Sequence, residues 1–148
     1  MKKFQLLSVL MLVLVMGMSS CKYEEGPFIS VIPKVERVTN TWIVSNATID
    51  GTQSSSISWL KQMTCFKDGG LDVLQSVLGL DVPYTGTWAF TDDKSGLTFL
   101  SKDDATGLFS FDRDLTILKL KEDLLKVTWI EPSSGADEVY VVEFVPSV

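Results

Sequence analysis

The sequence has 148 residues, with thirteen Lys and Arg, nineteen Asp and Glu and no His, which gives a formal net charge of −6. The absence of histidine removes the commonest general base and the commonest zinc ligand together. A nucleic-acid-binding surface needs clustered Lys and Arg to neutralise phosphates, and the few cations here are scattered among carboxylates. Composition and charge therefore argue against a nucleic-acid-binding protein and against most enzymes.

Residues 1–20 have the organisation of a signal peptide. Lys2 and Lys3 form a basic start, residues 4–18 form an apolar run, and two serines follow. The apolar run is about fifteen residues long, whereas a transmembrane helix needs roughly twenty. We therefore expect a peptidase to remove residues 1–20, so that they are not part of the fold.

Cys21 stands at the expected cleavage site, at the end of Met18-Ser19-Ser20-Cys21. This pattern fits a lipobox, in which the cysteine thiol accepts a diacylglyceryl group and the freed amine is then acylated. Two or three fatty acyl chains, such as palmitate, exceed what stable membrane anchoring requires. The sequence predicts a lipoprotein that is lipidated at Cys21. The alternative is an ordinary secretory signal with an incidental cysteine.

Cleavage leaves about 128 residues, enough for one domain with a core and too few for two. Without the two lysines of the signal, eleven basic residues face nineteen acidic ones, a formal charge of −8 that favours solubility. Pro27 and Pro33 disfavour regular structure in residues 21–35, which we interpret as a tether. The domain is then expected to span residues 36–148.

Acylation of Cys21 would leave Cys65 without a partner in the chain. We therefore expect no intramolecular disulfide, although the compartment would allow one. A reactive cysteine needs a neighbour that lowers its pKa, and no histidine is present for that role. We expect Cys65 to be a small buried apolar residue.

Beyond the tether, runs rich in Val, Ile, Thr and aromatic residues are separated by Gly, Asp, Asn and Ser clusters, as in all-β domains. The separating clusters predict hairpin turns, and successive hairpins make a meander. Apolar residues alternate with period two, which predicts one buried face. About eight such strands favour an antiparallel up-and-down β-barrel without exposed edges, with a β-sandwich as the alternative. The expected strands are residues 41–49, 57–66, 86–91, 96–101, 108–111, 115–121, 125–130 and 138–145.

Residues 71–78 fit two kinds of secondary structure. Leu71, Leu74 and Leu78 have the spacing of a helix face. Leu71 and Val73, together with the flanking glycines, suit a strand equally well. Periodicity cannot decide between helix and strand over so few residues, so both interpretations remain open on the residues alone.

Candidate catalytic and metal-binding groups are few. Acid–base catalysis needs two groups with different pKa values, but Asp92-Asp93, Asp103-Asp104 and the pair Asp112 and Asp114 fall in expected turns, where carboxylates are solvated. Calcium takes clustered carboxylates, yet no loop repeats the spacing of a known calcium site. The sequence has no Gly-x-Ser-x-Gly, no metal-ligating His or Cys pair and no phosphate-binding glycine loop. We predict no catalytic residue, no metal and no cofactor.

Aromatic residues are the remaining candidates. Each of the four tryptophans falls in an expected strand, and a barrel interior lined by such residues could enclose a small apolar ligand. In a small barrel, however, large side chains fill the interior, and packing is the favoured interpretation of the two. The candidate ligand-binding or core residues are Trp42, Trp59, Trp88, Phe90, Phe99, Phe111, Trp129, Tyr140 and Phe144.

Short motifs follow one another in order along the mature chain: Cys21-Lys22-Tyr23-Glu24-Glu25-Gly26-Pro27, Arg37-Val38, Thr41-Trp42, Phe66-Lys67-Asp68-Gly69, Gly86-Thr87-Trp88-Ala89-Phe90 and Leu115-Thr116-Ile117-Leu118-Lys119-Leu120. Together they resemble the small lipocalin-like lipoproteins of Bacteroidetes, over essentially the whole mature chain. The resemblance implies a lipocalin-like barrel with Trp42 in the first strand and residues 71–77 as a strand. Classical lipocalins carry Gly-x-Trp in the first strand, where this chain has Asn40-Thr41-Trp42.

The resemblance also implies attachment to the outer membrane. In such lipoproteins an acidic stretch after the acylated cysteine is similar to a surface-export signal, and Lys22-Tyr23-Glu24-Glu25 is a short version of it. The alternative is that these two glutamates only keep the tether soluble. Two functions follow: a non-enzymatic barrel that binds a small hydrophobic ligand near the membrane, or a structural module that contacts another envelope protein. An inhibitor of an external enzyme is a third, which no sequence feature favours.

Overall fold

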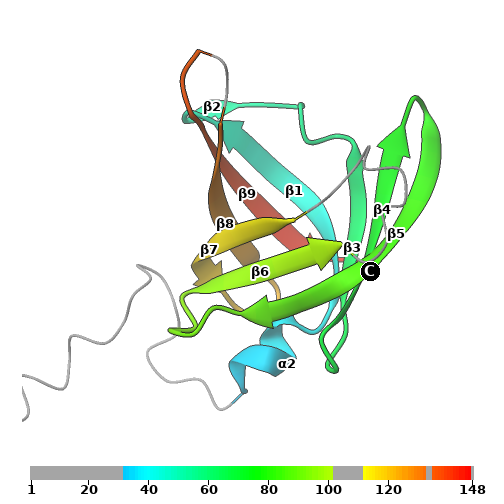
Figure 1. Cartoon of the computed structure of the whole chain (residues 1–148), viewed down its shortest axis with the longest axis vertical. Helices are drawn as coiled ribbons and strands as arrows, with labels where there is room; N and C mark the ends of the chain where they lie inside the picture. Colours follow the sequence, from blue (N-terminus) through cyan, green and yellow to red (C-terminus); the bar gives the residue numbers. More distant parts are fainter. Residues whose placement is uncertain (1–31, 102–111, 133–134, 148) are drawn as a thin grey trace, which may run out of the picture.

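The computed structural model describes residues 32–101, 112–132 and 135–147. This part of the chain contains one short helix and nine strands, and the helix lies at one end of a rolled sheet (Figure 1). In chain order the elements are α2 (Lys34–Val38), β1 (Thr41–Ile49), β2 (Thr52–Gln53), β3 (Leu60–Cys65), β4 (Gly70–Val77), β5 (Leu80–Phe90), β6 (Gly96–Ser101), β7 (Arg113–Leu120), β8 (Leu125–Glu131) and β9 (Glu138–Pro146).

The strands form one antiparallel sheet that closes on itself. Its order is β1-β3-β4-β5-β6-β7-β8-β9, with the two-residue β2 attached to the end of β1. β1 also pairs with β9, from Trp42 opposite Pro146 to Ile49 opposite Tyr140. This closure confirms the expected eight-stranded up-and-down barrel, the architecture that lipocalins have, and excludes a β-sandwich.

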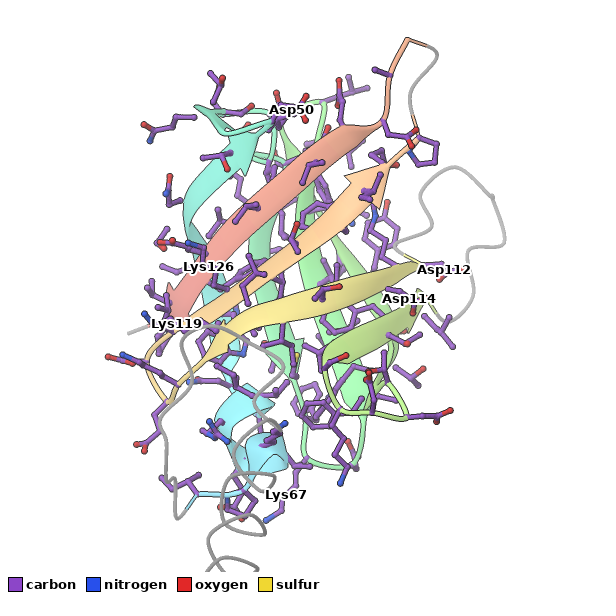
Figure 2. The ribbon with its side chains drawn as sticks, turned by 90° about the vertical axis from the view of Figure 1, so that its left-hand side faces the viewer. Asp50, Lys67, Asp112, Asp114, Lys119 and Lys126 are labelled. Atoms are coloured by element: carbon purple, nitrogen blue, oxygen red, sulfur yellow. The ribbon has the colours of Figure 1, made fainter. Side chains whose placement is uncertain are left out.

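The two ends of the barrel are built differently. Helix α2 lies across one end, which we call the α2 end, and Lys67 lies beside it (Figures 1 and 2). The β1–β2 turn reverses at Asp50 at the opposite end, which we call the Asp50 end (Figure 2). Because the strands run up and down, each contributes residues to both ends.

Buried contacts fix α2 to the barrel. The Nη1 of Arg37 donates to the carbonyl oxygen of Leu120 at 2.8 Å, and the Nε1 of Trp42 donates to that of Val38 at 2.9 Å. The helix follows directly on Pro33, whose lack of an N–H is tolerated at a helix start, and it begins within the stretch interpreted as the tether. No helix in the described part of the chain has the length and apolar composition needed to cross a membrane.

Side chains that point into the barrel form its core. In β8, Leu125, Val127 and Trp129 are buried, whereas Ile130 faces outward, as period-two alternation requires. The largest completely buried side chains are Trp42, Phe99, Ile57, Met63, Leu97, Ile117, Leu120, Leu125, Val38, Val127, Val142 and Cys65.

The ambiguous segment is a strand. Residues 70–77 form β4, which pairs with β5 along its whole length, and this confirms what the resemblance implied. The strand ends at Leu78 and Gly79, whose φ angles of 52° and 83° make the turn into β5.

β5 begins at Leu80, although the sequence analysis placed its start at residue 86. The unexpected part contains Pro83, which cannot donate a hydrogen bond to a neighbouring strand and is confined to edges. β6 pairs with β5 only from Gly86 onward. Within the described residues, the early part of β5 therefore has β4 alone as a partner, so proline is tolerated there.

Other strands also depart from expectation. β3 begins at Leu60 rather than at residue 57, because the N–H of Leu60 donates to the carbonyl oxygen of Ile57 at 3.0 Å in a turn. β2 was not expected, and its pairing with β1 extends the turn at Asp50. The strand expected at residues 108–111 lies outside the described residues.

Candidate functional site

The interior of the barrel is packed at the α2 end, and some of its side chains are partly exposed at the Asp50 end. Near α2, the inward-facing side chains of Trp42 and Leu125 are 0% exposed. Toward the Asp50 end, Tyr84 and Tyr140 also face inward, but both remain partly exposed. Ile57, Leu60 and Gln75, which also lie toward the Asp50 end, are buried. The exposed part of the interior at this end therefore includes the two tyrosines.

Three side chains from neighbouring strands form what we call the Trp129 stack. Trp129 on β8 and Tyr140 on β9 are cross-strand partners, with ring centroids 5.1 Å apart and an interplanar angle of 11°. Arg113 on β7 holds its guanidinium 5.5 Å from the centroid of the Trp129 ring. Aromatic stacking and cation–π contacts each contribute about 0.5–1.5 kcal/mol. The indole of Trp129 is therefore held in one orientation.

Two glutamates complete the polar groups around this stack. Arg113 makes a two-pronged contact with Glu131, Nη1 to Oε2 and Nη2 to Oε1, the second at 3.1 Å. The hydroxyl of Tyr140 donates to Oε2 of Glu138 at 2.8 Å. This hydrogen bond, with burial as a smaller cause, raises the pKa of Tyr140 above its ordinary value. The phenol is therefore protonated at neutral pH and remains a donor.

The Trp129 stack lies beside a surface depression. The depression has a volume of about 380 Å³, and Arg113, Trp129 and Glu131 line it together with their chain neighbours. The indole Nε1 of Trp129 is buried and has no hydrogen-bond partner in the described part of the chain. The stack thus combines aromatic surface, a neutralised cation and one unused donor.

The nine candidate aromatic residues fall into three groups. Five belong to the buried core, and three are partly buried and pack against it. Phe111 lies outside the described residues. The core group is Trp42, Trp88, Phe99, Trp129 and Phe144, and the partly buried group is Trp59, Phe90 and Tyr140.

The charged members of the site, Arg113 and Glu131, were not predicted from the sequence. One expected strand ended at residue 130 and another began at residue 115, which left Glu131 and Arg113 outside. Alternation could have found both, because each lies two residues from an inward-facing residue, Trp129 or Leu115. If the alternation is continued past the expected strand ends, it places a charged residue on the inward face of each strand.

No protein-family model matches the chain, and no curated protein matches it. Bovine odorant-binding protein with a selenium-containing odorant has a TM-score of 0.48 and 13% identity, covering 82% of this chain and 78% of its own. The bovine lipocalin allergen Bos d 2 has a TM-score of 0.48 and 9% identity, covering 76% and 75%. The fold assignment rests on the strand order and closure described above.

Cys65 lies in the core at the end of β3. Its side chain is buried, as expected from the sequence, and it forms no disulfide within the described residues. Burial raises the pKa of its thiol to about 12, because a thiolate would be poorly solvated there. The thiol is therefore protonated at neutral pH and is not poised as a nucleophile.

The acidic pairs that are described lie at the surface. Asp92 and Asp93 are exposed, and Oδ1 of Asp93 accepts hydrogen bonds from the N–H and hydroxyl of Ser95 at 2.9 and 2.7 Å. That carboxylate therefore stabilises the β5–β6 turn. Within residues 32–101, 112–132 and 135–147, no cluster of three or more His, Cys, Asp or Glu could hold a metal ion. Asp103-Asp104 lies outside the described residues.

Proposed function

We propose that this chain is a membrane-anchored, non-enzymatic barrel that holds a small hydrophobic molecule inside its Asp50 end. The observation that supports a ligand is that two inward-facing aromatic side chains there, Tyr84 and Tyr140, are partly exposed. An eight-stranded barrel is filled by side chains or holds one small ligand. We assign the first pattern to the α2 end and propose the second for the Asp50 end.

The proposed anchor is Cys21, which lies outside the described residues. Its support is the signal peptide and the lipobox, together with the resemblance to outer-membrane lipoproteins. The tether continues into α2, so the membrane attachment joins the barrel at the α2 end. The Asp50 end would then face away from the outer membrane and take up ligand from the aqueous side, in the periplasm or at the cell surface.

The ligand proposal is tested by filling the space. Ala47 is a small buried residue that faces the interior. It is the inward-facing residue before Ile49 on β1, and Ile49 is the cross-strand partner of Tyr140. Ala47→Phe should lower the affinity for an uncharged aromatic probe, acetylnaphthalene, by roughly tenfold or more, because the ring occupies the ligand's space. Isothermal titration calorimetry on the full chain measures this affinity.

Thr48→Phe is the matched control. Thr48 precedes Ile49 on the same strand and points to the outside of the barrel, so its replacement should leave the affinity unchanged. Overpacking a core costs about 1–3 kcal/mol, so the folding of both variants has to be checked. Circular dichroism provides this check. If both variants bind the probe as tightly as the wild type, or if the wild type binds none, the interior site is wrong.

A second candidate function is supported by the β4–β5 hairpin. Its tip rises beside the Asp50 end (Figure 1) and carries Leu78 and Leu80, which are 100% and 72% exposed. Leu78 has a φ of 52°, a left-handed conformation that favours Gly or Asn. An exposed leucine that costs stability is typical of a contact surface, so we propose protein binding by this tip as the alternative to ligand binding.

Leu78→Asn tests this alternative. The substitution should raise the free energy of unfolding by about 0.5–1 kcal/mol, because it relieves the backbone and removes no buried contact. Lys94→Asn is the control, since Lys94 is exposed with a φ of 56° but lies near α2, where its carbonyl oxygen accepts from Lys34. Cross-linking in cells should lose a partner only with Leu78→Asn. If Leu78→Asn shows the same cross-linked partners as the wild type, the proposal that the hairpin tip binds a protein is contradicted.

A further inference from the structure

The three buried tryptophans differ in what their indole N–H groups do. Nε1 of Trp42 donates to the carbonyl oxygen of Val38, and Nε1 of Trp88 donates to that of Phe66, both at 2.9 Å. Trp129 is 7% exposed, and its Nε1 is buried without a hydrogen-bond partner among the described residues. A buried donor without an acceptor is rare and calls for an explanation.

The unused donor of Trp129 is held in place rather than left loose. Tyr140 stacks on the indole at 5.1 Å, and the guanidinium of Arg113 lies 5.5 Å from the ring centroid. Nε1 itself is shielded from solvent, so water does not satisfy it. The fold therefore fixes a polar group that costs stability beside the partly exposed Tyr140.

The charges around the stack select the kind of acceptor. The cation of Arg113 is engaged by Glu131 in a two-pronged contact, and Glu138 adds a second carboxylate beside Tyr140. The local charge is negative, so an anionic group is repelled. An uncharged oxygen, such as a ketone, aldehyde or ester carbonyl, accepts from an indole N–H without that repulsion.

We infer that Trp129 Nε1 is the hydrogen-bond donor that recognises the carbonyl oxygen of an uncharged hydrophobic ligand. This inference rests on the proposed function and names its ligand class. Because Nε1 is covered, the ligand reaches it by displacing a neighbouring side chain.

Three naphthalene derivatives of similar size test the inference on the full chain. Acetylnaphthalene carries a carbonyl oxygen, ethylnaphthalene replaces that oxygen by hydrogen, and naphthoate carries a charge. Trp129→Phe should weaken acetylnaphthalene binding about five- to tenfold, the worth of one hydrogen bond. The same variant should change ethylnaphthalene affinity less than about twofold, because that probe has no acceptor. Naphthoate should bind the wild type about tenfold more weakly than acetylnaphthalene.

Trp88→Phe is the matched control, since its indole already donates to a backbone carbonyl. It should not alter the ratio of acetylnaphthalene to ethylnaphthalene affinity. A second readout in the wild type does not depend on any variant folding. In ¹⁵N-labelled protein, the indole proton of Trp129 should move downfield with acetylnaphthalene and not with ethylnaphthalene.

The outcomes separate the two claims. If both uncharged probes bind but Trp129→Phe weakens them equally, or the indole proton responds equally to both, the donor role is overturned while the ligand site stands. Tightest binding by naphthoate overturns the ligand class. If neither uncharged probe binds the wild type, the proposed function itself fails, and the inference fails with it.

Discussion

Trp42→Ala is expected to lower the free energy of unfolding by about 3–5 kcal/mol. Trp42 is 0% exposed, and it bonds the barrel to α2 through the carbonyl oxygen of Val38. Truncation removes the packing of the indole, leaves a cavity and leaves that carbonyl without its donor. A domain of this size has a total stability of about 5–15 kcal/mol, so the variant should be near the limit of folding. Urea denaturation followed by circular dichroism measures the loss.

Two further substitutions, Trp42→Phe and Trp59→Ala, serve as controls for this expected loss of stability. Trp42→Phe keeps most of the packing but not the hydrogen bond, so it should cost about 1–3 kcal/mol, less than alanine. Trp59→Ala changes a partly buried side chain that packs against the core, and it should also cost less than Trp42→Ala. A loss below about 1 kcal/mol for Trp42→Ala would show that the α2 end is not where the stability of the barrel resides.

Cys21→Ser is expected to move the protein from the membrane fraction to the aqueous fraction. The serine hydroxyl does not take the diacylglyceryl group, and in our proposal the acyl chains on Cys21 supply the anchoring free energy. Because the barrel core lies within residues 32–147, the variant should keep the circular dichroism spectrum and denaturation midpoint of the domain. Membrane fractionation with a radiolabelled fatty acid measures both retention and lipid incorporation.

Ser20→Ala is the matched control for this change, because it alters the neighbouring residue and keeps the thiol. It should remain in the membrane fraction and incorporate label. If Cys21→Ser still fractionates with the membrane, and the wild type never takes up label, then Cys21 is not the anchor and the chain carries an ordinary secretory signal.

Local patterns in the sequence were sufficient to predict most of the barrel. β1 and β6 have the expected bounds, because period-two alternation and flanking turn residues mark both of them. The start of β5 could not be predicted, because Pro83 argues against a strand unless the neighbouring strand is known to stop short. Pairing between distant segments decides such cases, and one sequence does not contain it.

The candidate site was predicted only in its aromatic part. Trp129 and Tyr140 were identified as interior residues, and their cross-strand pairing follows from register, which alternation alone does not give. Arg113 and Glu131 were missed because charged residues at strand ends are usually solvated. Their mutual contact makes an inward position tolerable, and that contact depends on the pairing of β7 with β8.

The two ends of the barrel differ in how their interiors are packed. At the α2 end, large side chains and a docked helix fill the interior and provide stability. At the Asp50 end, the same strands carry partly exposed aromatic residues and a fixed polar stack. In our proposal stability and binding are thus assigned to opposite ends of one barrel, which allows the binding end to change without loss of the core.

The position of a bound probe tests this account most directly. Nuclear Overhauser effects between acetylnaphthalene and the isotope-labelled full chain report which side chains the probe contacts. We predict contacts with Ala47, Tyr84 and Tyr140 inside the Asp50 end. Contacts confined to the exposed leucines of the hairpin, Leu78 and Leu80, or to the outer face of the sheet would contradict an interior ligand site.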